Sequence, residues 1–145
     1  MSVKEKIEEM LSDEYMICKK AHIGSTFHGE LIEVERKKWI WKERCWVLFT
    51  ESIHDDHDVL HVIDECTPPG SAVIVVESVE NGSFSDPKEL FWVNMKDRRI
   101  VHVIQLCGQH VQYDPDFYYA GDAVVKEILR KIKFIATTTG NQVEG

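Results

Sequence analysis

The sequence predicts an α+β fold, in which an antiparallel sheet of about five to seven strands packs against three helices. Two observations support this class. Apolar residues recur at helical spacing in three segments, near the amino terminus, at about 55–67 and at about 122–135. Between these segments lie runs of alternating or β-branched residues, most of them joined by short connections. Short connections favour antiparallel neighbours, because a parallel pair needs a long crossover.

The first and last helices are predicted from apolar periodicity and from their ends. Ser2 and Glu5 form a capping-box pattern at the start of the chain. Apolar residues then recur at helical spacing: Val3, Ile7, Met10 and Leu11. In the last segment, six apolar residues share one face: Val124, Val125, Ile128, Leu129, Ile132 and Ile135. The cations of this segment lie toward its carboxyl end, where the helix dipole favours positive charge.

Six runs are predicted as strands from their alternation or their β-branched content. In chain order they are EYMICKKAHI, FHGELIEVE, KWIWKERCWVLFTES, SAVIVVESV, IVHVIQLCG and HVQY. A further run, KELFWVNM, suits a strand but follows Pro87, a residue that also begins helices. We predict a strand for residues 87–95, with a helix as the alternative.

The chain of 145 residues fits one domain, which we expect over residues 1–136, followed by a disordered polar tail at 137–145. No apolar run is long enough for a secretory signal or a membrane span, so we expect a cytoplasmic protein that does not bind membranes. The order of elements resembles that of small acidic chaperones of secreted effectors. The ending VVKEILRKIKF after a strand region resembles PsbP-like domains.

Charge is distributed unevenly along the chain. The formal net charge of −8 argues against a nucleic-acid partner, because such proteins need a cationic face. Between Cys45 and Pro87 there are nine carboxylates and no lysine or arginine, and we call residues 46–86 the acidic block. A field of this sign attracts a basic partner. The basic stretch 36–44 directly precedes the block, and a homodimer that pairs the two is an alternative.

The segment ESIHDDHDVLHVIDEC, residues 51–66, contains the densest group of titratable side chains. At about 100° per residue, its valine, leucine and isoleucine side chains fall on one arc, which predicts a helix with that arc on the core. His57, His61 and Asp64 then point into water. Two histidines one turn apart could hold a divalent metal, with Asp64 as a third ligand. The alternative is a solvated polar face, because a structural zinc site needs four protein ligands.

The function predicted from these features is non-catalytic binding. The motifs GxGxxG, HExxH and GxSxG are absent, so no catalytic residue and no cofactor is assigned. We expect an inhibitor-like, immunity-like, chaperone-like or adaptor-like protein that binds a basic macromolecule, most simply another protein. The expected contacts are acidic and aromatic: Asp55, Asp56, Asp58, Asp64, Tyr113, Phe117, Tyr118 and Tyr119. The alternatives are a metal-binding protein or metal-dependent enzyme that uses His57 and His61, and a small-molecule carrier with an aromatic pocket.

Overall fold

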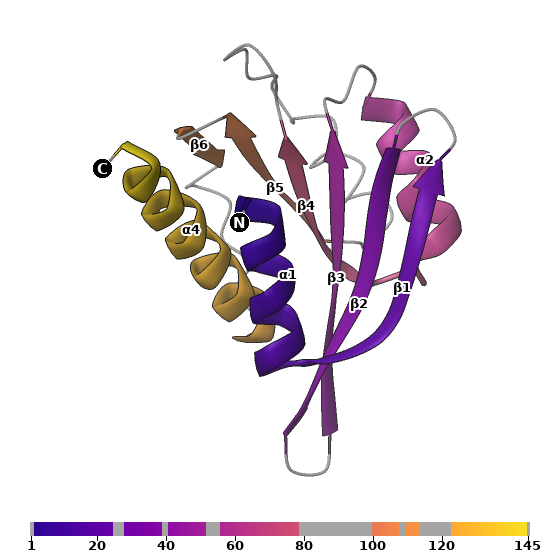
Figure 1. The fold of residues 1–145 in the computed structure, drawn as a ribbon. Coiled ribbons are helices and arrows are strands. Elements are labelled where there is room, and N and C mark those ends of the chain that lie inside the picture. Colours follow the sequence, from indigo (N-terminus) through magenta and orange to yellow (C-terminus); the bar gives the residue numbers. More distant parts are fainter. Residues whose placement is uncertain are drawn as a thin grey trace.

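The computed structural model describes residues 2–24, 28–38, 41–51, 56–78, 100–107, 110–113 and 123–144. For some residues at the ends of elements, His57 and Tyr113 among them, it describes the backbone alone. Within these ranges, three helices and six strands follow in chain order (Figure 1): α1 (Val3–Glu14), β1 (Met16–Gly24), β2 (His28–Lys38), β3 (Trp41–Glu51), α2 (Asp56–Cys66), β4 (Ala72–Ser78), β5 (Ile100–Cys107), β6 (His110–Tyr113) and α4 (Ala123–Glu144). The α+β class is confirmed, and the ambiguous run 87–95 lies outside the described residues.

The sheet is mixed, so the prediction of an antiparallel sheet is wrong in part. Its strands follow the order of the sequence, β1 to β6. The pairs β1–β2, β2–β3 and β5–β6 are antiparallel, whereas β3–β4 and β4–β5 are parallel. Helix α2 carries the chain from the end of β3 back to the start of β4, which makes this pair parallel. Accordingly, β4 is buried on both faces from Ala72 to Glu77, as strands of parallel sheets usually are.

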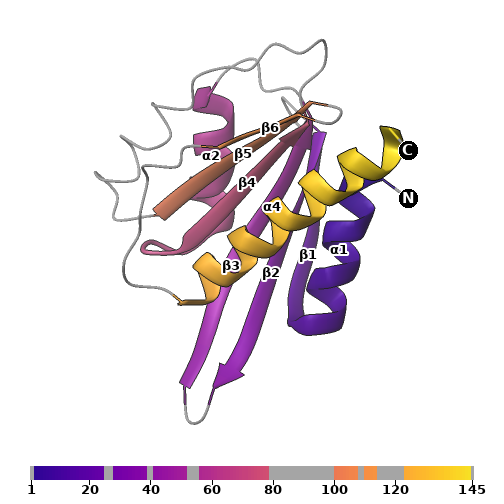
Figure 2. The ribbon, with the colours of Figure 1, turned by 90° about the vertical axis from the view of Figure 1, so that its left-hand side faces the viewer.

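Helices cover both faces of the sheet. Helices α1 and α4 lie side by side on one face and α2 lies on the other (Figures 1 and 2). The core under α1 and α4 includes Val34, Val47, Phe49, Ile74, Ile104, Ile128 and Ile132. The core under α2 includes Leu31, Trp46, Leu48, Val59, Ile63, Val73 and Val75. Strand β3 contributes large side chains to both cores, with Val47 and Phe49 on one face and Trp46 and Leu48 on the other.

The first helix begins and ends as its sequence predicts. The Ser2 side chain accepts a 3.1 Å hydrogen bond from the backbone N–H of Glu5, and the Ser2 hydroxyl donates to the Glu5 carboxylate at 3.2 Å. Ile7 and Leu11 are fully buried on its inner face. Tyr15 is extended and ends the helix, with its N–H still bonded to the carbonyl of Leu11.

The last helix is longer than predicted. It continues to Glu144, so the segment predicted as a disordered tail is helical through residue 144. Ala136 is still buried, and the hydroxyl of Thr137 bonds to the carbonyl oxygen of Lys133 at 2.8 Å. This hydrogen bond satisfies the threonine hydroxyl within the helix. In the described part of the chain, no helix combines the length and the apolar character needed to cross a bilayer.

Helices α1 and α4 run antiparallel. From Met10 to Tyr15, the neighbours of this segment on α4 run from Ile135 back to Glu127. The start of α1 and the carboxyl end of α4 therefore lie at the same end of this helical layer, on the face of the sheet opposite α2 (Figure 2).

Candidate functional site

Helix α2 turns its apolar side chains to the sheet, as predicted. Val59, Leu60, Val62 and Ile63 are buried, and three of them join the core formed with Trp46, Leu48 and Val75. Most of the hydrophobic free energy of this helix comes from that face, at about 1.5–3 kcal/mol for each fully buried side chain of this size. The apolar arc therefore fixes which residues of α2 face water.

The opposite side of α2 is polar and accessible. The side chain of His61 is 70% exposed, and its Nε2 lies 3.0 Å from Oε1 of Glu65, one turn later. Asp64 is exposed as well, and Asp58 is half-buried. We call Asp58, His61, Asp64 and Glu65 the acidic face of α2. For His61 and Asp64, the predicted outward orientation is confirmed.

The metal prediction depends on His57 and stays untested. His57 lies in the first turn of α2, but its side chain is outside the described part of the chain. Among the described residues, no group of three histidine, cysteine, aspartate or glutamate side chains is placed to hold a metal ion. His61 interacts with Glu65 in this structure, and a metal would have to displace that contact.

One member of the acidic block does not lie on the surface. Glu77, near the end of β4, is only 2% exposed and accepts a 2.7 Å hydrogen bond from Nε2 of Gln105 on β5. Thr50 is its register partner on β3 and is buried too. At most eight of the nine carboxylates in the acidic block can therefore contribute to its surface. A β-branched run such as SAVIVVESV indicates burial on both faces, and this signal could have identified Glu77 as buried.

The remaining predicted contacts lie outside the described side chains. Asp56 belongs to the first turn of α2 and Tyr113 ends β6, and of both only the backbone is described. Residues Asp55, Phe117, Tyr118 and Tyr119 fall in segments that the structure does not describe. The structure therefore neither joins the aromatic residues to the acidic face nor separates them from it.

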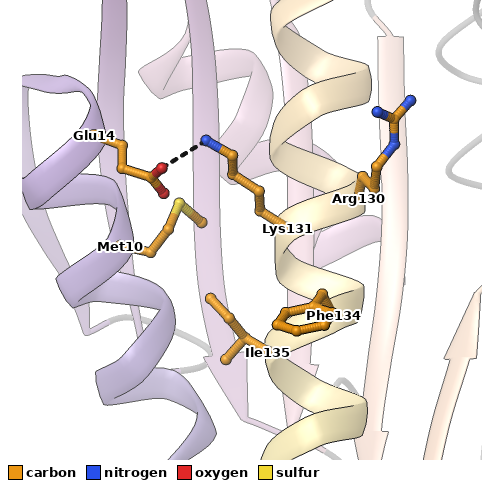
Figure 3. Close-up of a pocket in the computed structure, with 6 residues that line it drawn as sticks. All are labelled: Met10, Glu14, Arg130, Lys131, Phe134 and Ile135. Atoms are coloured by element: carbon orange, nitrogen blue, oxygen red, sulfur yellow. Dashed lines mark hydrogen bonds and ion pairs between the residues drawn. The ribbon is translucent and has the colours of Figure 1, made fainter.

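A groove between α1 and α4 is the feature that sequence reasoning missed. Six residues line it: Met10, Glu14, Arg130, Lys131, Phe134 and Ile135 (Figure 3). Lys131 reaches across it, and its Nζ lies 2.9 Å from Oε1 of Glu14. The side chain of Phe134 stands beside the groove, and this residue is 69% exposed. Helical spacing identified the buried face of α4, but it says nothing of which helix lies alongside.

An ion-pair network adjoins this groove, and Lys131 belongs to both. Glu127 of α4 accepts hydrogen bonds from the Tyr15 hydroxyl at 2.6 Å and from Arg36, and it pairs with Lys131 at 3.1 Å. The hydrogen bond from Tyr15, together with those from Lys131 and Arg36, lowers the pKa of Glu127 to about 2. Burial and the same carboxylate raise the pKa of Tyr15 to about 12. Both groups keep one protonation state near neutral pH, so these contacts between α1, the sheet and α4 persist there.

The space between the sheet and α4 is filled by side chains. Ile74, Ile104, Ile128 and Ile132 meet there, and each is at most 1% exposed. Among the described residues, the layer between the sheet and α4 is therefore packed core.

The fold and these surfaces define a class: an α+β domain with a mixed sheet, helices on both faces and one acidic helical surface. Comparison with known proteins adds no narrower assignment, because no protein-family model matches the chain and no curated protein matches it.

Proposed function

We propose that this protein is a non-catalytic cytoplasmic binding protein, and that the acidic face of α2 captures a basic protein. An inhibitor or immunity protein and a chaperone or adaptor both work in this way. The observation that supports the proposal most directly is the exposure of His61, Asp64 and Glu65 on a helix whose other side is anchored in the core. A rigid helix presents these side chains in fixed positions, which is an advantage for recognition.

The charge pattern supports a basic partner over a neutral one. Residues 46–86 contain no lysine or arginine, so the chain on both sides of α2 brings no cation of its own to this face. Clustered charge of one sign accelerates association with a partner of the opposite sign, and the effect weakens as salt screens it. In the proposal, the aromatic residues at 113–119 anchor the partner after this capture, because tyrosine and phenylalanine are enriched at interfaces.

The experiment compares two variants that remove the same charge from opposite faces of the sheet. Asp64→Asn combined with Glu65→Gln removes the two exposed carboxylates of the acidic face and leaves the half-buried Asp58. The matched control, Glu5→Gln combined with Glu9→Gln, neutralises two exposed carboxylates on α1. Each variant and the parent protein are used to co-purify partners from the native host at about 50 mM salt, where the Debye length exceeds 10 Å.

We expect a basic protein to co-purify with the parent and the control, and to be lost with the α2 variant. The same partner should dissociate as the salt concentration rises. An unchanged set of partners for the α2 variant would contradict the proposal. If both variants lost the partner equally, net charge, and not the acidic face, would control binding.

A further inference from the structure

We propose that the groove between α1 and α4 is a homodimer interface, in which two copies pack face to face around a two-fold axis parallel to the groove. Helices α1 and α4, whose residues line the groove, lie on the face of the sheet opposite α2 (Figure 2), so the dimer is independent of the acidic face.

The apolar side chains at the groove indicate a covered surface. Phe134 is one of two large hydrophobic residues exposed in the described part of the chain, with 69% of its surface accessible. Met10 and Ile135 beside it are half-buried and line the same groove. An exposed aromatic ring next to apolar side chains and within a charged border is the usual composition of a protein interface.

The two walls of the groove carry opposite charge. Helix α1 contains five carboxylates and two lysines, whereas residues 123–138 of α4 contain four cations and one carboxylate, Glu127. On the solvent side of α1, Glu9 and Asp13 are exposed, and on that of α4, Lys126 and Arg130 are exposed. A partner that fits this surface must present a positive strip to α1 and a negative strip to α4.

A second copy of the chain meets this requirement by symmetry. In a face-to-face dimer the two-fold axis lies in the plane of the interface. If the axis runs along the groove, α1 of each copy lies on α4 of the other, and opposite charges meet. If the axis runs across the groove, α1 lies on α1 and like charges meet. Charge complementarity therefore selects the first arrangement.

The same symmetry predicts which residues meet. A two-fold axis along the groove keeps each residue at its own height along the axis. Lys131 contacts Glu14, and Ile135 lines the groove with Met10, so position 13 is level with position 132 and position 10 with position 135. Arg130 lies about 3 Å along the helix from the level of Asp13, within reach of its long side chain, and Phe134 is next to Ile135. Asp13 of one copy should meet Arg130 of the other, and Phe134 should pack on Met10. Each contact occurs twice in the dimer.

The size of the surface predicts a modest affinity. Helix α1 has 12 residues and is therefore about 18 Å long, which limits the area that two such helix pairs can bury. Stable interfaces bury about 800 Å² on each partner, and smaller ones are usually transient. We expect a dimer that dissociates with a micromolar constant.

The test uses sedimentation equilibrium of the full chain from about 5 to 500 μM, a range that brackets a micromolar constant. The parent protein should change from monomer to dimer across this range. Asp13→Lys alone and Arg130→Glu alone each place two like-charge pairs in the homodimer, so each should raise the dissociation constant at least about tenfold. An equimolar mixture of the two variants restores both opposite-charge pairs and should dimerise again.

Two further variants establish which face of the protein forms the dimer. Phe134→Ser should also favour the monomer, and its circular dichroism spectrum should match that of the parent because Phe134 is exposed. Asp64→Asn with Glu65→Gln should leave the dimer unchanged, since α2 lies on the other face. A parent protein that is monomeric throughout overturns the proposal, as does a mixture of the two charge variants that fails to dimerise.

Discussion

The hydroxyl of Tyr15 donates a 2.6 Å hydrogen bond to Oε1 of Glu127, and this contact joins residues 112 positions apart in the sequence. Tyr15 caps the end of α1, and Glu127 lies in the second turn of α4. Arg36 of β2 and Lys131 of α4 bind the same carboxylate. One side chain thus connects α1, the sheet and α4, and this explains how two helices from opposite ends of the chain keep their relative position.

We predict that Tyr15→Phe lowers the free energy of unfolding by about 1–2 kcal/mol, because a hydrogen bond to a charged acceptor is lost while the ring still packs. Glu127→Gln should cost more, since Arg36 and Lys131 lose their anionic partner as well. Chemical denaturation of the two single variants and the double variant measures the coupling between the two side chains. Additive effects would show that the 2.6 Å contact contributes nothing.

A second prediction concerns acid stability. Burial lowers the pKa of His102 on β5 to about 4, below its ordinary value near 6.5. Between these pH values the unfolded chain binds a proton that the folded chain does not, so stability falls as the pH drops from about 6.5 to 4. Between pH 7 and pH 4.5, the free energy of unfolding of the parent should fall by about 2 kcal/mol more than that of the His102→Gln variant.

Chemical denaturation at the two pH values provides the measurement. The other titrating groups are the same in both proteins, so their contributions cancel in the comparison. Parallel pH profiles for the parent and the variant would mean that His102 is protonated equally well in the folded and unfolded states.

A third prediction compares neighbours on α2. Ile63→Ala should lower the free energy of unfolding by about 2–4 kcal/mol, because it leaves a cavity under a side chain that is 1% exposed. His61→Ala should change it by less than about 0.5 kcal/mol, since an exposed pair contributes little. Thermal or chemical denaturation of the two variants and the parent measures these changes in the free energy of unfolding. Similar costs for the two variants would contradict the orientation of α2 on which the proposed function depends.

The sequence predicted local features well because their signals are local. The arc of Val59, Leu60, Val62 and Ile63 was enough to place a helix and to assign its two faces. The Ser2 cap was predicted in the same way, as was the short strand His110–Tyr113. In each case the signal comes from residues that are close together in the sequence, even where packing on distant residues provides most of the stability.

Features that depend on distant residues were not predicted. The direction of β4 relative to β3 depends on where α2 returns the chain, although the unbroken burial of Ala72–Glu77 is typical of a parallel strand. The end of α4 was placed too early, because threonine and glycine are weak helix formers, and the hydrogen bond from Thr137 to Lys133 does not show in the pattern. The groove beside Phe134 exists because α1 packs on α4, and no local periodicity reveals that contact.

The start of α1 and the carboxyl end of α4 lie close together, at one end of the layer whose residues line the groove (Figure 2). An affinity handle or surface tether attached to either end would crowd the groove, while α2 would still face the solution. Immobilised protein is therefore well oriented for capturing ligands of α2. Self-association is better measured with the handle removed and the protein free in solution.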